Sequence, residues 1–429
     1  MSTKKYPFSD DFDDLSRFSL DMSSDLRLRL TNFLMGTQYR YRSPDEHVQK
    51  TTHTIEGYQG HKLTIDVLTP KRATEPLPWV YYSHGGGFLM DLLPAHMDIC
   101  SEYAARANCV VVIPHYRVAI RDPFPISVED CYAGLKWAIE NAASLGLDLS
   151  RLALAGESAG GALTASLSQI VRDRSLTEPL FQMLIYPVTS NRLDSDSMVN
   201  MPDAPVWGAE NARKSWSKYL QGHDTPPKYA SPLETEDFSG LPPAYIEPCE
   251  FDVLRDEGVA YAHRLREAGI PVELNVTKGT IHAFDLNRDS AITQDALSRR
   301  VRALRQAFAR VEQRITLLIH ITVQPGEKDT VVKYFEGVAR NVRSEPGTNL
   351  YTWSFDSSGE RAVIIEQYAD VAAFLRHMEQ TDTREVALVA SFERVSVCGM
   401  LPEALRESLK ERLDAKFYAP LGGITNIGK

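Results

Sequence analysis

Ser158 is the residue of this sequence best placed to act as a nucleophile, because it lies in a G-x-S-x-G pattern at residues 156–160. The apolar run 152–155 before it predicts a strand, and segment 158–172 begins with small residues and continues with helical spacing. A sharp turn from strand to helix strains the serine backbone and exposes its hydroxyl. The helix N-terminus behind it favours developing negative charge. In this context the pattern predicts a nucleophile rather than an incidental serine in a glycine-rich turn.

A second glycine-rich pattern, His-Gly-Gly-Gly-Phe at residues 84–88, follows the apolar run 79–83. Consecutive glycines allow the backbone to point several N–H groups toward one position. Acyl transfer to a serine passes through a tetrahedral oxyanion that needs such donors. The two patterns, each after an expected strand, therefore favour acyl-transfer chemistry over two flexible turns.

A serine nucleophile needs a base, which an acid must orient, in the chain order Ser, acid, His. His282 is the best base, because it lies in a loop after the expected strand 272–276. Asp252 is the best acid, after the expected strand 244–247, and Glu250 is its rival. Four other histidines follow Ser158. His223 lies in an insertion, His263 lies inside an expected helix, and His320 and His377 lie in the last part of the chain.

The sequence around these residues alternates between expected strands and expected helices. This alternation predicts a mostly parallel α/β sheet with helices on both faces. The expected strands are 65–68, 79–83, 110–114, 152–155, 183–186, 244–247 and 272–276. Residues 8–50 carry apolar residues at helical spacing, and residues 188–240 interrupt the alternation with a polar insertion. We interpret both segments as parts of a helical lid.

The pattern restarts near residue 314 in the order β-α-β-β-α-β, which is typical of a ferredoxin-like α+β domain. Its expected strands are 316–323, 350–355, 362–367 and 394–398, with helices at 331–342 and 371–380. The sequence therefore predicts two domains, at residues 1–314 and 315–429. We expect residues 401–429 to continue as a helix and tail on the second.

Composition excludes several other classes of protein. The 429 residues are 43% hydrophobic and 24% charged, which indicates globular domains. The formal net charge of −10 disfavours binding to nucleic acid. The five cysteines lack metal-ligand spacing, and neither a signal peptide nor a membrane span is predicted. We therefore expect a cytoplasmic protein without a metal or other cofactor.

The motifs together resemble the hormone-sensitive lipase group of α/β-hydrolases over residues 20–310. They are HGGGF at 84–88, HYRVAIRDPFPISVEDCYAGLKW at 115–137, GESAGG at 156–161, YASPL at 229–233, DVLRDEG at 252–258 and IHAF at 281–284. The resemblance implies a triad of Ser158, His282 and Asp252, and a cap from about 1–50 and 188–225. It also implies an oxyanion hole formed by the N–H groups of Gly86, Gly87 and Ala159. The chain departs from the family where Glu157, Val253 and Ala283 replace the more usual Asp, Pro and Gly, and where the usual Y-R-L-A-P-E reads YRVAIR at 116–121.

Residues 315–415 resemble the antibiotic-biosynthesis monooxygenase superfamily, which has a dimeric ferredoxin-like fold. The matching segments are ITLLIHITVQPG at 315–326, EPGTNLYTWSFD at 345–356 and AVIIEQYAD at 362–370. Some of these proteins oxidise aromatic polyketides without metal or flavin. The residues that could line a cavity in this domain are Tyr351, Trp353, Tyr368 and His377. However, aromatic residues that alternate on a strand more often belong to a core.

The sequence thus predicts a serine carboxylic-ester hydrolase, an esterase or lactonase, for a small to medium and mostly apolar ester. Phe88, Trp207 and Trp216 are the candidate substrate-binding residues. The alternative is a bifunctional polyketide-tailoring enzyme, with cofactor-free oxygenation in the second domain. A ligand receptor on the hydrolase fold is a third, less favoured hypothesis. The expected partners are a small-molecule ester or lactone and a second copy of the chain, the latter through the C-terminal domain.

Overall fold

The computed structural model describes residues 4–18, 22, 24–73, 76–312, 315–384, 386–399, 401–402, 405–407, 409–410 and 415–418. The chain divides into two compact units, Met1–Ala307 and Phe308–Lys429. Helix α10 (Ala291–Glu312) runs across this division. Residues 313 and 314, where the sequence predicts the domain boundary, lie outside the described residues.

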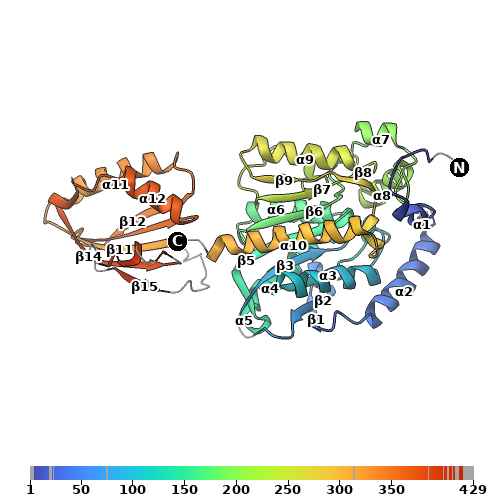
Figure 1. Cartoon of the computed structure of the whole chain (residues 1–429), viewed down its shortest axis with the longest axis horizontal. Coiled ribbons are helices and arrows are strands. Elements are labelled where there is room, and N and C mark those ends of the chain that lie inside the picture. The colour runs from blue at the N-terminus through green and yellow to red at the C-terminus, as the bar shows by residue number, and fades with distance from the viewer. Residues whose placement is uncertain are drawn as a thin grey trace. The chain divides into compact units, whose positions relative to one another are not determined.

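The first unit is built on an eight-stranded sheet with the order β1-β2-β4-β3-β5-β6-β7-β9 (Figure 1). Its strands are β1 (Val48–Glu56), β2 (Lys62–Pro70), β3 (Leu77–Ser83), β4 (Val110–Pro114), β5 (Leu147–Glu157), β6 (Phe181–Ile185), β7 (Ala244–Glu247) and β9 (Val272–Leu274). All pairs from β4 to β9 are parallel, whereas β2 pairs antiparallel with both β1 and β4. Every residue of β4 and β6 is buried, as expected for strands covered on both faces. The predicted mostly parallel α/β sheet is confirmed.

Strand β1 was not predicted, and its first three residues fall within segment 8–50, where the sequence predicts helix; the N-terminal helical segment thus ends before residue 48. The helix α2 (Asp25–Tyr41) stops at the extended Arg42. Most of β1 is polar and only its two ends, Val48 and Ile55, are buried. The prediction missed it because an edge strand with one partner and little burial lacks the apolar signal of a central strand.

The helices of the first unit lie around this sheet (Figure 1). Besides α2 and α10 they are α1 (Asp13–Ser16), α3 (Pro94–Ala107), α4 (Ile126–Glu140), α5 (Ala142–Leu145), α6 (Ala159–Asp173), α7 (Asp196–Asn200), α8 (Ala209–Tyr219) and α9 (Arg255–Glu267). Helix α6 is buried from Ala159 to Val171, because it packs against strands β3, β5 and β6 and against helix α4. The insertion between β6 and β7 contributes α7 and α8, in agreement with the expected helical insertion.

The second unit is an antiparallel sheet with the order β12-β13-β11-β14, to which β15 is added in parallel (Figure 1). Its elements are β11 (Ile315–Val323), α11 (Lys328–Val342), β12 (Thr348–Phe355), β13 (Arg361–Tyr368), α12 (Val371–Gln380), β14 (Ala390–Cys398) and β15 (Lys416–Tyr418). The order β-α-β-β-α-β is the predicted ferredoxin-like topology. Strand β15 was not predicted, because the sequence suggested only a helix and tail beyond residue 401.

Candidate active site

Ser158 stands at the tight turn between strand β5 and helix α6. Its backbone has φ 55° and ψ −122°, a conformation that is costly for a residue with a side chain. The Ser158 N–H donates a 2.9 Å hydrogen bond to the Ile185 carbonyl, which holds the turn to strand β6. A Cβ atom on Gly160 would lie 2.0 Å from the Ser83 carbonyl oxygen, so glycine is required there for the helix to approach strand β3. The sequence motif therefore produces the predicted turn.

His282 and Asp252 come from the ends of two short strands, β10 (Thr277–Ile281) and β8 (Cys249–Phe251), which pair in parallel. The Ser158 Oγ lies 3.0 Å from His282 Nε2, and His282 Nδ1 lies 2.7 Å from Asp252 Oδ2. The other oxygen of Asp252 accepts a 3.0 Å hydrogen bond from the Leu254 N–H. All three side chains are buried. The structure thus brings together the serine, histidine and aspartate that the sequence singled out.

The rival acid, Glu250, lies outside this chain of hydrogen bonds. Its carboxylate accepts hydrogen bonds from Lys278 Nζ at 2.9 Å and from the Gly279 N–H at 2.8 Å. These partners lower its pKa from the ordinary value, although desolvation alone would raise it. Glu250 therefore stabilises strand β10, which precedes His282, without contacting the imidazole.

The glycine-rich loop follows β3 and carries the predicted oxyanion-hole residues Gly86 and Gly87. Both have positive φ, at 119° and 61°, which places their backbone in a region that favours glycine. Neither N–H group donates a hydrogen bond to another residue in the part of the chain that the structure describes. The N–H of Ala159, as the first residue of α6, has no acceptor within the helix. These three groups are thus available to an added oxygen atom.

Glu157, next to the nucleophile, anchors that loop, a role that sequence reasoning missed. Its buried carboxylate accepts hydrogen bonds from the Gly85 N–H and the Tyr82 hydroxyl, and it lies 3.0 Å from His96 Nε2. The residue was noted only as a departure from the usual aspartate. Its partners lie on other segments of the chain, so no local pattern could have identified them.

Asn32 of α2 connects the N-terminal segment to the same loop. Its side-chain amide donates to the Leu89 carbonyl at 2.9 Å, and its oxygen accepts from the Asp91 N–H at 3.1 Å. Because Asn32 is buried, these hydrogen bonds are shielded from water. The N-terminal helix thus contacts the loop next to the candidate oxyanion hole.

The three candidate substrate-binding residues gather beside the triad. Phe88 stacks on Tyr219 of α8 with ring centroids 4.0 Å apart, and its ring lies 5.3 Å from that of Trp216. The Trp207 ring lies 5.8 Å from the imidazole of His282. All four aromatic side chains are buried. The insertion therefore supplies three of the four side chains of this apolar wall, and Trp207 brings the wall against the histidine.

A buried network behind His282 was not visible in the sequence. The Tyr186 ring packs edge-on against the imidazole at 4.9 Å, and its hydroxyl donates a 2.7 Å hydrogen bond to Asp285. Arg300 of α10 donates to Asp285 at 2.7 Å and to Glu247 at 2.6 Å and 3.0 Å. The network ties helix α10 to the loop that carries the histidine.

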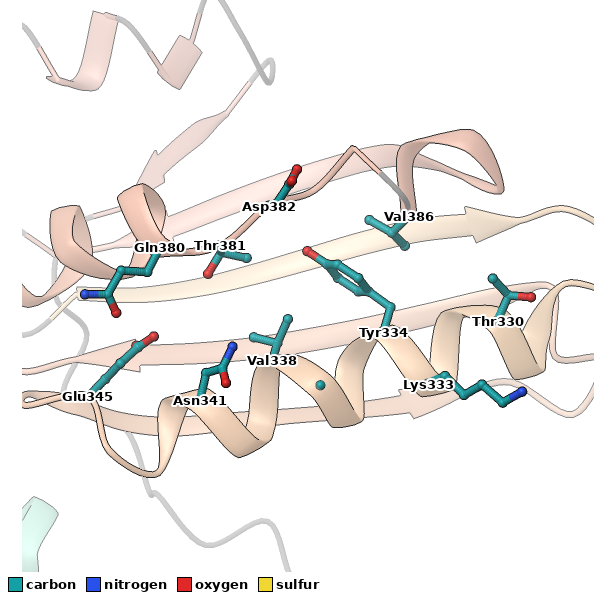
Figure 2. Close-up of a pocket in the computed structure, with 11 residues that line it drawn as sticks. Thr330, Lys333, Tyr334, Val338, Asn341, Glu345, Gln380, Thr381, Asp382 and Val386 are labelled. Carbon is teal, nitrogen blue, oxygen red and sulfur yellow. The ribbon is translucent and has the colours of Figure 1, made fainter.

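The four candidate residues of the second unit take part in its core rather than in an open site. Tyr368 is buried in this core, against which Tyr351 and Trp353 pack. His377 is buried as well, and its ring nitrogens lie 2.8 Å from Glu345 Oε2 and 3.1 Å from Thr381 Oγ1. A pocket with a volume of about 570 Å³ lies between α11 and the segment that follows α12, and Figure 2 shows the residues that line it. None of the four candidates is among its lining residues, which are Thr330, Lys333, Tyr334, Gly337, Val338, Asn341, Glu345, Gln380, Thr381, Asp382 and Val386.

No group of three or more His, Cys, Asp or Glu side chains in the described ranges is arranged to hold a metal ion. No helix within them has both the length and the apolar character to cross a bilayer.

Comparison with known families matches both parts of the chain. Residues 80–286 match the family described as alpha/beta hydrolase fold. Residues 314–387 match the family described as antibiotic biosynthesis monooxygenase.

Individual relatives point to the same group of proteins. Carboxylesterase NlhH of Mycobacterium tuberculosis is 37% identical over 233 residues, which cover 53% of this chain and 73% of the relative. Esterase LipI of the same species is 36% identical over 52% of this chain and 70% of the relative. Among solved structures, a bacterial heroin esterase is 34% identical, with a TM-score of 0.63. The match covers 68% of this chain and 94% of the esterase chain. Esterase LipW of Mycobacterium marinum is 30% identical, with a TM-score of 0.66. This match covers 70% of this chain and 96% of the LipW chain. The chain thus belongs to the α/β-hydrolase fold family, in which it falls among the carboxylic-ester hydrolases.

Proposed function

We propose that the first unit hydrolyses carboxylic esters through an acyl-enzyme formed on Ser158. The observation that carries this proposal is the continuous hydrogen-bonded chain from Ser158 through His282 to Asp252. His282 Nε2 accepts the Ser158 proton while Oγ attacks the acyl carbon, and the resulting imidazolium gives that proton to the leaving alkoxide. Water, activated by the same imidazole, then releases the acid.

Asp252 and the glycine-rich loop complete this mechanism. Asp252 accepts the Nδ1–H of His282, so that Nε2 is free to act as the base, and it stabilises the imidazolium that forms. The N–H groups of Gly86, Gly87 and Ala159 donate to the tetrahedral oxyanion. Each such donor typically contributes about 3–4 kcal/mol of barrier lowering.

The preferred ester is a small to medium one, or a lactone, that is mostly apolar around the carbonyl. The aromatic wall of Phe88, Trp207 and Trp216 beside the triad supports this substrate class. Buried aromatic side chains favour apolar groups, with selectivity coming from a few polar atoms.

The test is hydrolysis of 4-nitrophenyl esters, from acetate upward, by the unmodified chain and by Ser158→Ala. We expect turnover by the unmodified chain and a loss of about 10⁴-fold or more in kcat for the variant. The chain-length profile measures the size of the acyl site. Equal turnover by both proteins would overturn the serine mechanism.

The bifunctional alternative is not favoured. The named relatives that match the first unit are esterases, and no contact among the described residues of the second unit favours oxygenation. Its aromatic candidates pack in or against the core, and the buried His377 already has Glu345 and Thr381 as partners.

A further inference from the structure

Ser215, in the middle of helix α8, has a buried hydroxyl without a hydrogen-bond partner among the described residues. A serine inside a helix usually bonds to the carbonyl one turn earlier. Ser215 makes no such bond, although its side chain is buried. A buried polar group without a partner is costly, so its retention calls for an explanation.

The position of this hydroxyl relates it to the candidate oxyanion hole. A Cβ atom placed on Gly87 would lie 3.0 Å from Ser215 Oγ and 2.6 Å from Trp207 Cη2. Ser215 therefore packs directly against the backbone of the glycine-rich loop, on the side where Trp207 approaches His282. The Ser215 hydroxyl therefore lies close to the backbone of Gly87, which carries one of the candidate oxyanion-hole N–H groups.

Two further polar atoms from the same insertion lack partners among the described residues. They are the indole Nε1 atoms of Trp207 and Trp216, both buried. An indole nitrogen only donates hydrogen bonds, whereas a hydroxyl donates and accepts. The cluster of Trp207, Ser215 and Trp216 thus offers three donors within an otherwise apolar wall. Each of these groups can donate a hydrogen bond to an acceptor oxygen.

We propose that Ser215 donates a hydrogen bond to a second oxygen atom of the substrate, close to the scissile ester, and so selects oxygenated esters over purely hydrocarbon ones. Oxo, alkoxy and acyloxy groups supply such an oxygen. An apolar isostere leaves the Ser215 hydroxyl buried and unpaired, which penalises that substrate. This inference rests on the proposed esterase activity and adds to it a residue that determines specificity.

The experiment compares two pairs of esters in which one oxygen replaces one methylene. The acyl pair is 4-nitrophenyl methoxyacetate and 4-nitrophenyl butanoate, and the alcohol pair is 2-methoxyethyl acetate and butyl acetate. The ratio of kcat/KM within each pair is measured for the unmodified chain and for Ser215→Ala. Differences in intrinsic reactivity cancel when the two proteins are compared. We expect the preference for the oxygenated member to fall about three- to tenfold in the variant, in one of the two pairs.

Ser101→Ala provides a matched control. Ser101 is another buried serine inside a helix whose hydroxyl has no partner among the described residues, but it lies on α3. We expect this variant to leave both ratios unchanged. Ser215→Ala should not lower Tm, because the lost hydroxyl has no described partner to leave unpaired.

The outcomes separate this inference from the proposed function. A change confined to the acyl pair or to the alcohol pair supports the inference and identifies which side of the ester carries the oxygen. Unchanged ratios in both pairs, with hydrolysis still dependent on Ser158, would overturn the role of Ser215 and leave the esterase intact. Turnover that persists in Ser158→Ala would instead contradict the proposed function itself.

Discussion

At the scale of single residues, Asp252 and Glu250 provide the sharpest test of the site, because both are carboxylates near His282 and only Asp252 contacts its ring. Asp252→Asn keeps the shape of the side chain but favours the wrong imidazole tautomer. We expect kcat for 4-nitrophenyl butanoate to fall by roughly 10³–10⁴-fold, with KM little changed. Steady-state kinetics at pH 7 measure both constants.

Glu250→Gln is the matched control for this prediction. A glutamine oxygen still accepts a hydrogen bond from the Gly279 N–H, so strand β10, which precedes His282, keeps this contact. We expect kcat to stay close to that of the unmodified chain. A large loss in Glu250→Gln together with a small loss in Asp252→Asn would exchange the two assignments.

The sequence was a better guide to the reacting residues than to the residues that support them. Ser158 and the glycines of the loop belong to short local patterns whose backbone requirements are visible in the sequence. Glu157 and Tyr186 were missed, because their partners are separated from them by tens of residues. Such partners are chosen by the tertiary fold, and a single sequence contains no local trace of them.

At the scale of elements, helix α10 is fixed to the loop of His282 by the buried side chain of Arg300. Arg300→Met removes the partner of two buried carboxylates, Glu247 and Asp285. Breaking a buried ion pair from one side leaves an uncompensated charge and typically costs about 3–5 kcal/mol. We expect the free energy of unfolding, measured by urea titration of the full chain, to fall by about that amount.

The neighbouring Arg299 gives the comparison on the same helix. Its partner Asp295 is exposed, with 67% of its side-chain surface accessible. Exposed pairs one helical turn apart contribute about 0.3–0.5 kcal/mol. Arg299→Met should therefore have a small effect. Equal losses in both variants would show that the buried network does not stabilise the fold more than a surface pair.

Elements were predictable where their residues carry a clear apolar or β-branched pattern. Central strands such as β4 combine β-branched residues with full burial and were found at their observed positions. Strand β1 was missed because it is mostly polar, and strand β15 was missed because it is only three residues long. Two short strands, β8 and β10, were expected only as loops after longer strands, and their pairing places Asp252 beside His282.

At the scale of the whole molecule, the second unit has one sheet face that its own helices leave uncovered. Buried residues of β11 and β13 alternate with half-buried or exposed residues on the other face, where Leu318, Val363 and Ile365 lie among polar neighbours. Leu318 pairs directly with Ile365, Val363 follows on the same side of β13, and Leu350 of β12 is 42% exposed. These four apolar side chains form a small accessible patch, and such patches are candidate contact surfaces.

We expect this face to pair with the same face of a second copy, which forms a closed two-fold dimer of the full chain. Light scattering should then give twice the mass of one chain. Ile365→Lys places a charge at the centre of the face, where pairing would desolvate it at a high cost. The variant should therefore give the mass of a single chain and keep its ester hydrolysis, because the triad lies entirely in the first unit.

Leu388→Lys controls for the general effect of adding a charge to this unit. Leu388 is 76% exposed and lies in the short helical turn Val386–Leu388 rather than on the sheet. This variant should remain a dimer. A single-chain mass for the unmodified protein would remove the dimer, and a dimer that persists in Ile365→Lys would place the contact on another surface. If Ile365→Lys instead abolished hydrolysis along with pairing, the site in the first unit would depend on assembly, and the second unit would contribute to catalysis through the dimer.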